Sequence, residues 1–212
     1  MYLLDETLWF PNPSEANQDG LLAVGGNLSP ERLLLAYNSG IFPWFNDDEM
    51  IMWWSPNPRM VMFPKELKIH KSMRQLFNQQ KFKVTYNTHF KDVITACSEI
   101  ERPDQDGTWI TSQMIDAYTE LNHQGVATSV EVWQDNLLVG GLYGIYLKDK
   151  HLFCGESMFT KVSNASKYGF ISLVRKLESE GVKLIDCQMH TNHLERLGAK
   201  EISRESFLEF LK

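Results

Sequence analysis

The chain has 212 residues, enough for one domain with an attachment or for two small domains. With 43% hydrophobic and 23% charged residues it has the composition of a globular protein, which excludes collagen-like, coiled-coil and disordered classes. No apolar run approaches the roughly 18 residues of a membrane span, and no signal peptide is visible. Three widely spaced cysteines, Cys97, Cys154 and Cys187, indicate free thiols in a reducing cytoplasm.

Charge is distributed unevenly along the chain, whose net charge is −6. Residues 64–91 carry seven basic side chains against one acidic side chain, whereas the segments on either side are acidic. We call four of these residues, Lys71, Arg74, Lys81 and Lys83, the basic island. A protein of this kind does not coat nucleic acid, but it can hold a polyanion at one place. The alternative, which charge alone favours, is a solvated helix face.

Residues 1–62 predict a small N-terminal domain with aromatic loops. Ser29 is followed by proline and begins a helix, because serine caps free backbone amides and proline suits the first helical position. Gly40 ends this helix. Two aromatic segments broken by proline follow at 41–45 and 51–59, and the second predicts a turn.

Residues 63–212 predict an α+β domain, because helical periodicity and strand alternation are both present. The predicted helices cover 71–80, a segment capped by Thr88 and running to Cys97, a segment capped by Ser112, 164–180, and a short stretch before Leu197. The predicted strands cover 82–86, 127–134, 137–147, 151–158 and 183–188. An antiparallel central pair followed by a helix and a strand resembles the acetyltransferase (GNAT) fold.

Two glycine pairs, Gly25-Gly26 and Gly140-Gly141, do not fit the phosphate-binding patterns of nucleotide loops. The second pair lies inside a predicted strand, where glycine marks a bulge or a close approach of backbone. Such a bulge is also how the acetyltransferase fold opens its sheet to an acyl donor. The pyrophosphate loop of coenzyme A users is missing after Phe159, so we expect a donor other than a coenzyme A thioester.

Polar residues inside apolar strands mark the candidate site. Asp186 and Gln188 are two residues apart and share one face of a regular strand, with Ile185 on the opposite face. Glu156 lies between apolar residues on a predicted strand beside the bulge. Because buried polar groups are costly unless they are hydrogen-bonded, the alternative to a catalytic site is a buried hydrogen-bond network.

Cysteine and histidine give weaker signals. Cys154 has apolar neighbours, so we interpret it as a packed thiol rather than a nucleophile. Cys187, His190 and His193 have a spacing that lacks a fourth ligand, so a surface helix is favoured over a metal site.

A series of segments, in order along the chain, resembles the leucyl/phenylalanyl-tRNA–protein transferase family. The matching segments are 20–30, 36–45, 53–59, 107–111, 129–133, 153–159, 164–167 and 184–188. The resemblance covers about residues 10–210, and Asn27 departs from it where the family often has Asp.

The resemblance implies a cytoplasmic enzyme that transfers Leu or Phe, and also Met, from aminoacyl-tRNA to the N-terminal Lys or Arg of acceptor proteins. The new peptide bond marks the acceptor for degradation. The resemblance also implies an acetyltransferase-like (GNAT/Fem-related) C-terminal domain, no metal and no other cofactor. We expect no membrane partner and a monomeric state.

The resemblance places Asp186 and Gln188 at the reacting centre, and we expect Glu156 beside them to pair with the cationic acceptor or its ammonium group. Four apolar residues are expected to hold the aminoacyl side chain, and Ile185 can join them only if its strand twists or bulges: Leu142, Phe153, Met158 and Ile185. The residues expected around the terminal adenosine and the substrate are Tyr37, Trp44, Trp109, Tyr118 and Asn164. The basic island is expected to hold the tRNA acceptor stem.

The expected chemistry is aminolysis of an ester. The acceptor α-amine has a pKa of about 8, so orientation and oxyanion stabilisation are expected to supply most of the catalysis. We expect Gln188 to orient the amine and Asp186 to polarise it or to accept its proton through a neighbour, with the tRNA ribose oxygens as a further proton shuttle. Two alternatives remain, a coenzyme A-dependent acetyltransferase and a non-catalytic tRNA-binding module.

Overall fold

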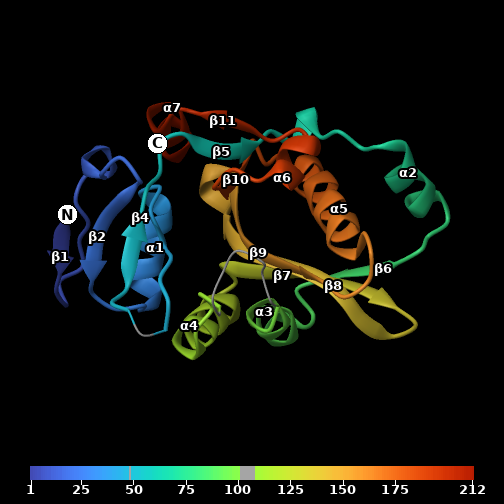
Figure 1. Ribbon diagram of the computed structural model, residues 1–212, viewed down its shortest axis with the longest axis horizontal. Helices are drawn as coiled ribbons and strands as arrows, with labels where there is room; N and C mark the ends of the chain where they lie inside the picture. Colours follow the sequence, from blue (N-terminus) through green and yellow to red (C-terminus); the bar gives the residue numbers. More distant parts are fainter. Residues whose placement is uncertain (48, 101–107) are drawn as a thin grey trace.

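The computed structural model describes residues 1–47, 49–100 and 108–212, and within them the chain forms two β-sheets flanked by helices (Figure 1). The smaller sheet has four strands in the order β1 (Tyr2–Leu4), β2 (Leu21–Gly25), β4 (Met52–Trp54) and β3 (Phe42–Pro43). The larger sheet has seven strands in the order β11 (Lys200–Ile202), β5 (Arg59–Met62), β10 (Leu184–Gln188), β9 (Leu152–Thr160), β8 (Leu137–Leu147), β7 (Ala127–Gln134) and β6 (Lys83–Tyr86). Gly107, which belongs to one matching segment, lies outside the described residues.

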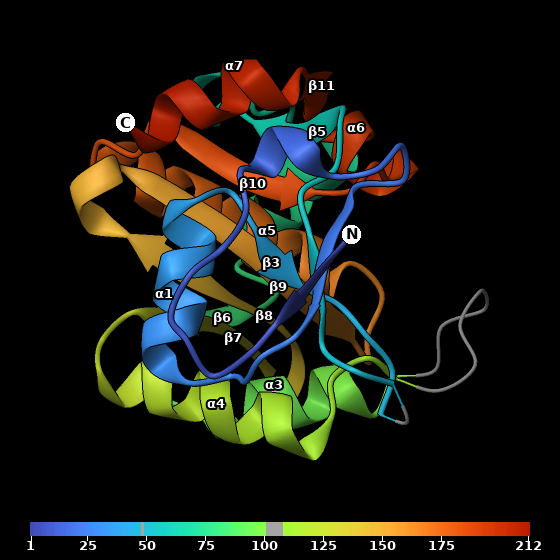
Figure 2. The same cartoon turned by 90° about the vertical axis from the view of Figure 1, so that its left-hand side faces the viewer.

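Helices cover both faces of the larger sheet. α3 (Phe90–Ser98) and α4 (Ser112–His123) lie on one face, and α5 (Ala165–Ser179) lies on the other (Figure 1). α1 (Pro30–Asn38) packs against β3 and α4 (Figure 2), and Figure 1 shows it between the smaller sheet and the larger one. The shorter helices are α2 (Lys71–Asn78), α6 (Asn192–Arg196), α7 (Arg204–Leu208) and the single turns η1 (Pro13–Glu15), η2 (Pro64–Glu66), η3 (Lys148–Lys150) and η4 (Glu209–Leu211). Among the described residues, no helix has both the length and the apolar character needed to cross a membrane.

The predicted α+β, acetyltransferase-like order of elements is confirmed. Strands β6 to β9 are antiparallel, and α5 then carries the chain to β10, which pairs with β9 in parallel. β10 pairs in turn with β5, which comes from early in the chain. β5 therefore belongs to the larger sheet, although its residues fall on the N-terminal side of the predicted division after residue 62.

Buried apolar residues form one cluster on each face of the larger sheet. The first cluster joins α3 and α4 to the N-terminal residues, among them Tyr37 and Trp53. The second lies under α5 and includes Leu142, Phe153 and Phe170. The described residues of the smaller sheet therefore share their hydrophobic core with the larger sheet.

The predicted start of α1 is confirmed, but two other predicted caps are wrong. The Ser29 hydroxyl accepts the Arg32 amide at 3.3 Å. Helix α4 is capped by Thr111 rather than Ser112. Thr88 does not cap α3 either, because its side chain is turned toward a buried carboxylate on β7, that of Glu131.

Register shifts in the larger sheet decide where its side chains point. The sequence predicts a bulge at Gly140-Gly141, whereas the extra residue between β7 and β8 is the adjacent Val139. Gly140 instead allows α5 to approach, since a Cβ there would lie 2.7 Å from the Cβ of Ala165. Two further shifts leave Glu156 of β9 and Cys187 of β10 without partners in the neighbouring strand.

Candidate active site

A cavity of about 440 Å³ lies where β9 and β10 separate. The parallel pairing of the two strands ends at Cys154 and Asp186, and each strand has its extra residue just beyond that point. Eight of the predicted site residues line this cavity: Trp44, Trp109, Leu142, Phe153, Glu156, Met158, Ile185 and Gln188. The volume falls in the range of small-molecule sites, roughly 300–1,000 Å³.

The β10 bulge overturns the predicted division of faces. Asp186 and Gln188 do not share a face, because Cys187 is an extra residue between them. Gln188 also adopts a left-handed conformation, with φ of 62°. Ile185, Cys187 and Gln188 consequently line the cavity, whereas Asp186 does not.

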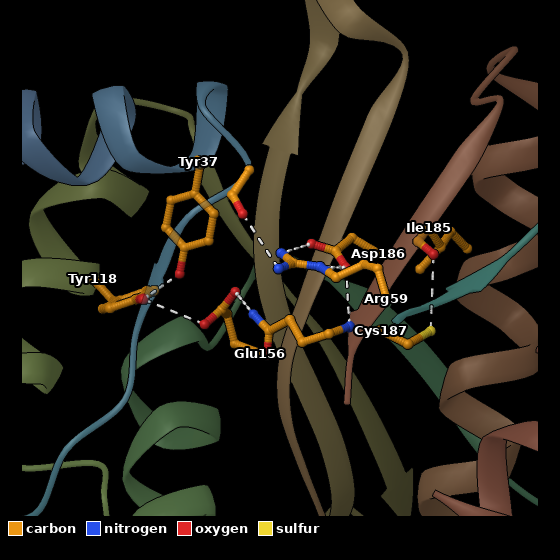
Figure 3. Close-up of polar contacts among 9 residues, drawn as sticks. Tyr37, Arg59, Tyr118, Glu156, Ile185, Asp186 and Cys187 are labelled. Atoms are coloured by element: carbon orange, nitrogen blue, oxygen red, sulfur yellow. Dashed lines mark hydrogen bonds and ion pairs between the residues drawn. The ribbon is translucent and has the colours of Figure 1, made fainter. Parts of the chain in front are cut away.

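Asp186 is bound to a buried arginine that the sequence analysis did not single out. Arg59 of β5 donates from Nε to Oδ1 at 2.8 Å and from Nη2 to Oδ2 at 2.6 Å (Figure 3). Both side chains are 1% exposed. Burial opposes the charge of Arg59, but the carboxylate of Asp186 outweighs it and raises the pKa of the guanidinium. Asp186 thus serves as the buried counter-ion of Arg59.

Asp186 also positions Gln188. The backbone amide of Gln188 donates to Asp186 Oδ1 at 2.9 Å, while its side-chain Nε2 donates to Glu156 Oε1, also at 2.9 Å. Gln188 is therefore fixed by one hydrogen bond from its backbone and one from its side chain. Its Oε1 is the remaining acceptor on a side chain that lines the cavity.

Glu156 ends a buried chain of hydroxyl groups. The hydroxyls of Tyr37 and Tyr118 are hydrogen-bonded to each other, and Tyr118 donates to Glu156 Oε2 at 3.3 Å (Figure 3). Burial raises the pKa of Glu156 to about 8, against the tyrosine hydroxyls, which favour the charged form. The carboxyl is consequently mostly protonated at neutral pH.

Three residues predicted around the adenosine or the substrate lie elsewhere. Tyr37 and Tyr118 are 2% and 0% exposed and are absent from the cavity wall, so neither presents a ring face for stacking. Their polar hydroxyls serve the Glu156 chain instead. Asn164 precedes α5 at φ of 69° and is likewise absent from the wall.

Trp44 and Trp109 are the two predicted aromatics that do line the cavity. Trp54 of β4 holds Trp44, because the rings lie 5.6 Å apart and the Trp54 indole donates to the Trp44 carbonyl at 2.7 Å. An indole at a cavity wall offers a flat apolar face to a base.

The described residues favour neither a nucleophilic cysteine nor a metal site. Burial raises the pKa of the Cys154 and Cys187 thiols, which favours packed, protonated thiols over nucleophiles. No group of three or more His, Cys, Asp or Glu side chains among these residues could hold a metal ion.

Comparison with known proteins decides the family. A model of the leucyl/phenylalanyl-tRNA protein transferase family matches residues 61–212, and a model of its N-terminal domain matches residues 26–57. The transferase of Christiangramia forsetii is 60% identical over 211 residues, with 100% of each chain covered. That of Pseudomonas aeruginosa is 52% identical over 209 residues, covering 99% of this chain and 88% of the relative.

The chain belongs to the leucyl/phenylalanyl-tRNA protein transferase family. It is an aminoacyltransferase, which moves an aminoacyl group from tRNA to protein. Solved structures match at greater distance. L-PGS from Bacillus licheniformis has a TM-score of 0.45 and 11% identity, covering 81% of this chain and 54% of that chain. A GCN5-related N-acetyltransferase from Kribbella flavida has a TM-score of 0.38 and 9% identity, covering 85% and 63%.

The basic island of this transferase lies apart from the cavity. Its four residues are exposed, two on α2 and two at β6, and none of them lines the cavity wall. In Figure 1 both elements lie at the end of the molecule opposite the smaller sheet.

Sequence reasoning missed several residues that line the cavity of the transferase, and also Arg59, which binds Asp186 without lining the cavity. Phe42 and Phe170 carry no signal beyond apolar character, which core residues share. Arg59 had one usable signal, a charge directly before the apolar run of β5. His193, interpreted as part of a surface helix, faces the cavity instead.

Proposed function

We propose that this transferase moves Leu or Phe, and also Met, from aminoacyl-tRNA to the N-terminal Lys or Arg of acceptor proteins. We further propose that it acts in the cytoplasm as a monomer without a cofactor, and that the product is marked for degradation. The observation that carries the proposal is the cavity, in which an apolar pocket and two indole rings meet the polar pair Glu156 and Gln188.

The apolar part of the cavity suits the side chain of the transferred amino acid. Its walls include Leu142, Phe153, Met158 and Ile185, together with Phe170 from α5. Methionine and phenylalanine side chains in the pocket wall can adapt to unbranched or aromatic substrate side chains. A β-branched side chain would clash with the wall, because its branch lies close to the reacting carbonyl. The terminal adenosine would stack on Trp44 or Trp109, for about 1–3 kcal/mol per base.

Transfer is an ester aminolysis in which the acceptor nitrogen attacks the ester carbonyl carbon. The nitrogen–carbon bond forms, the carbon–oxygen bond to the ribose breaks, and the ribose oxygen leaves with a proton. Gln188 Oε1 would accept a hydrogen bond from the amine and aim its lone pair, although an amide is too weak a base to keep the proton. Asp186 would act through Gln188, as a positioning residue.

Gln188→Ala should lower the rate of transfer by about 10²-fold, because the amine loses its orienting acceptor. The melting temperature and tRNA affinity should stay unchanged, since the Gln188 side chain is only partly buried. Labelled leucine transfer to a peptide that begins with Arg measures the rate. Gln124→Ala, at an exposed position after α4, is the control. An unaltered rate in the Gln188 variant would remove this residue from the mechanism.

Charge-neutral variants of the basic island should weaken tRNA binding equally for all tRNA sequences. Each lost phosphate contact should flatten the log–log salt dependence by about 0.7–0.9, because fewer counterions are released. Transfer from a minimal aminoacyl-adenosine donor should be unaffected, and Lys183→Gln, an exposed lysine before β10, should change neither measurement. If the minimal donor suffered equally, the island would belong to the active site or to the fold.

Transfer of labelled leucine from leucyl-tRNA to an Arg-peptide tests the function as a whole. Formation of the labelled peptide is the expected result. Binding of leucyl-tRNA without its consumption would favour a tRNA-binding module, and a rise in melting temperature with acetyl-coenzyme A would favour an acetyltransferase.

A further inference from the structure

His193 of α6 is a cavity residue that the mechanism above leaves without a role. It lines the same cavity as Gln188 and Glu156. Its Nε2 is buried and has no hydrogen-bond partner among the described residues. Because buried polar atoms are nearly always paired in folded proteins, this unpaired nitrogen at the cavity wall is available to a group that binds in the cavity.

The surroundings of His193 keep its imidazole neutral. Burial lowers its pKa, and the positive charges of Lys167 on α5 and Arg196 on α6 lower it further. The strands β8, β9 and β10 contribute the titratable groups Tyr143, Glu156 and Cys187 to the wall of the same cavity. A neutral imidazole holds one nitrogen lone pair that can accept a hydrogen bond or a proton.

The other acidic and basic groups near the reacting centre are poor proton acceptors at neutral pH. Asp186 is held by Arg59 and does not line the cavity. Glu156, with its pKa of about 8, already carries a proton in most molecules. Burial raises the pKa of the Cys187 thiol, which therefore also keeps its proton.

We propose that His193 Nε2 is the catalytic base that removes the proton from the α-ammonium group of the acceptor. This inference rests on the proposed function. His193 takes the first proton and becomes an imidazolium, which returns that proton to solvent. The free amine then attacks the ester carbonyl carbon. The second nitrogen proton passes to the ribose oxygen as the carbon–oxygen bond breaks, so that amide, ribose hydroxyl and one released proton account for all atoms.

The pH dependence of a His193→Gln variant separates this role from a structural one. At pH 7 transfer to an Arg-peptide should fall by about tenfold, because without His193 only the roughly one α-amine in eleven that is already deprotonated in solution can attack. The loss should shrink to less than about twofold at pH 9, because the α-amine, with a pKa of about 8, is by then mostly deprotonated in solution. Ionisation of Glu156 affects both proteins, so the ratio of wild-type to variant rate at each pH cancels it.

His190→Gln is the matched control. His190 lies three residues earlier, is 43% exposed, pairs with Glu195 at 3.4 Å and does not line the cavity. Its replacement should leave the rate unchanged at every pH. A His193→Ala variant supplies a second readout, because added imidazole should restore a part of its transfer at pH 7.

A loss that is the same at pH 7 and pH 9, or a rate at pH 7 within about threefold of wild type, would overturn the role of His193. Melting temperatures of both His193 variants should lie within a few degrees of wild type, since no hydrogen bond is lost. If His193→Gln has a clearly lower melting temperature, the His193→Ala variant decides the question: restoration of transfer by imidazole supports the role of His193 as a base, and no restoration contradicts it. Failure of the wild-type protein to transfer to any peptide would overturn the proposed function instead.

Discussion

Asp186→Ala should lower the free energy of unfolding by about 3–5 kcal/mol, because it strands the charge of Arg59 in the protein interior. Arg59 is 1% exposed, and the other oxygen that it reaches is the Gly40 carbonyl, at 3.3 Å. The rings of Phe42 and Phe207, 4.8 and 4.6 Å from the guanidinium carbon, cannot replace a carboxylate.

Urea unfolding of the wild-type and variant proteins measures this loss. Glu66→Ala is the matched control, because Glu66 pairs with Lys200 at 2.8 Å while both side chains are about half exposed. An exposed pair of this kind contributes at most about 1 kcal/mol. Equal losses in the two variants would show that Asp186 is not the essential partner of Arg59.

A double variant separates stability from catalysis. Arg59→Met combined with Asp186→Leu replaces the pair by apolar side chains, a change that often restores stability. Transfer should stay impaired, because the Gln188 backbone amide has lost its acceptor and the side chain is no longer aimed. A stable double variant with wild-type transfer would show that Asp186 positions nothing.

Glu156→Gln should make the protein more stable, and the gain should grow with pH. The carboxyl has a folded-state pKa of about 8 against an ordinary value of 4.5, so the folded state holds its proton more tightly than the unfolded state. Ionisation therefore costs stability as the pH rises from about 4.5 to 8. At about 1.4 kcal/mol for each pKa unit, the full cost is on the order of 3–5 kcal/mol.

Thermal or urea unfolding between pH 5 and pH 9 measures this gain. Glu131→Gln is the matched control, because it should change the free energy of unfolding in the opposite direction. Glu131 is also fully buried, but hydrogen bonds from Ser129, Thr85 and Thr88 outweigh burial and lower its pKa. Its replacement should cost stability at neutral pH, and that cost should fade as the solution becomes acidic enough to protonate the wild-type carboxylate. A pH-independent difference for Glu156→Gln would show that its carboxyl is not held neutral by burial.

The same Glu156 variant tests whether Glu156 recognises the N-terminal Lys or Arg of the acceptor. If Glu156 meets the cationic Lys or Arg of the acceptor, Glu156→Gln should raise KM for Arg-peptides more than it alters donor binding. A normal KM would assign Glu156 to positioning Gln188, which donates to it at 2.9 Å.

Local patterns in the sequence carried the prediction of most elements. The alternation of β7 and β8, the cap of α1 at Ser29 and the helical period of α5 are properties of neighbouring residues, and each appears in the structure within about two residues of its predicted bounds. The family was also accessible from the sequence, because contiguous segments carry the resemblance. So was the apolar pocket, since Phe153 and Met158 lie on one predicted strand.

Tertiary structure alone decided which polar residues line the cavity. A single extra residue in a strand reverses the direction of every side chain after it, and the extra residues Glu156 and Cys187 are recognisable only from the neighbouring strands. The partner of Asp186 comes from 127 positions earlier in the chain, on a strand that pairs with β10. Tyr37 and Tyr118 became links in a buried hydroxyl chain that ends at the Glu156 carboxyl, instead of stacking platforms, because long-range packing determines whether an aromatic ring reaches a cavity wall or a core.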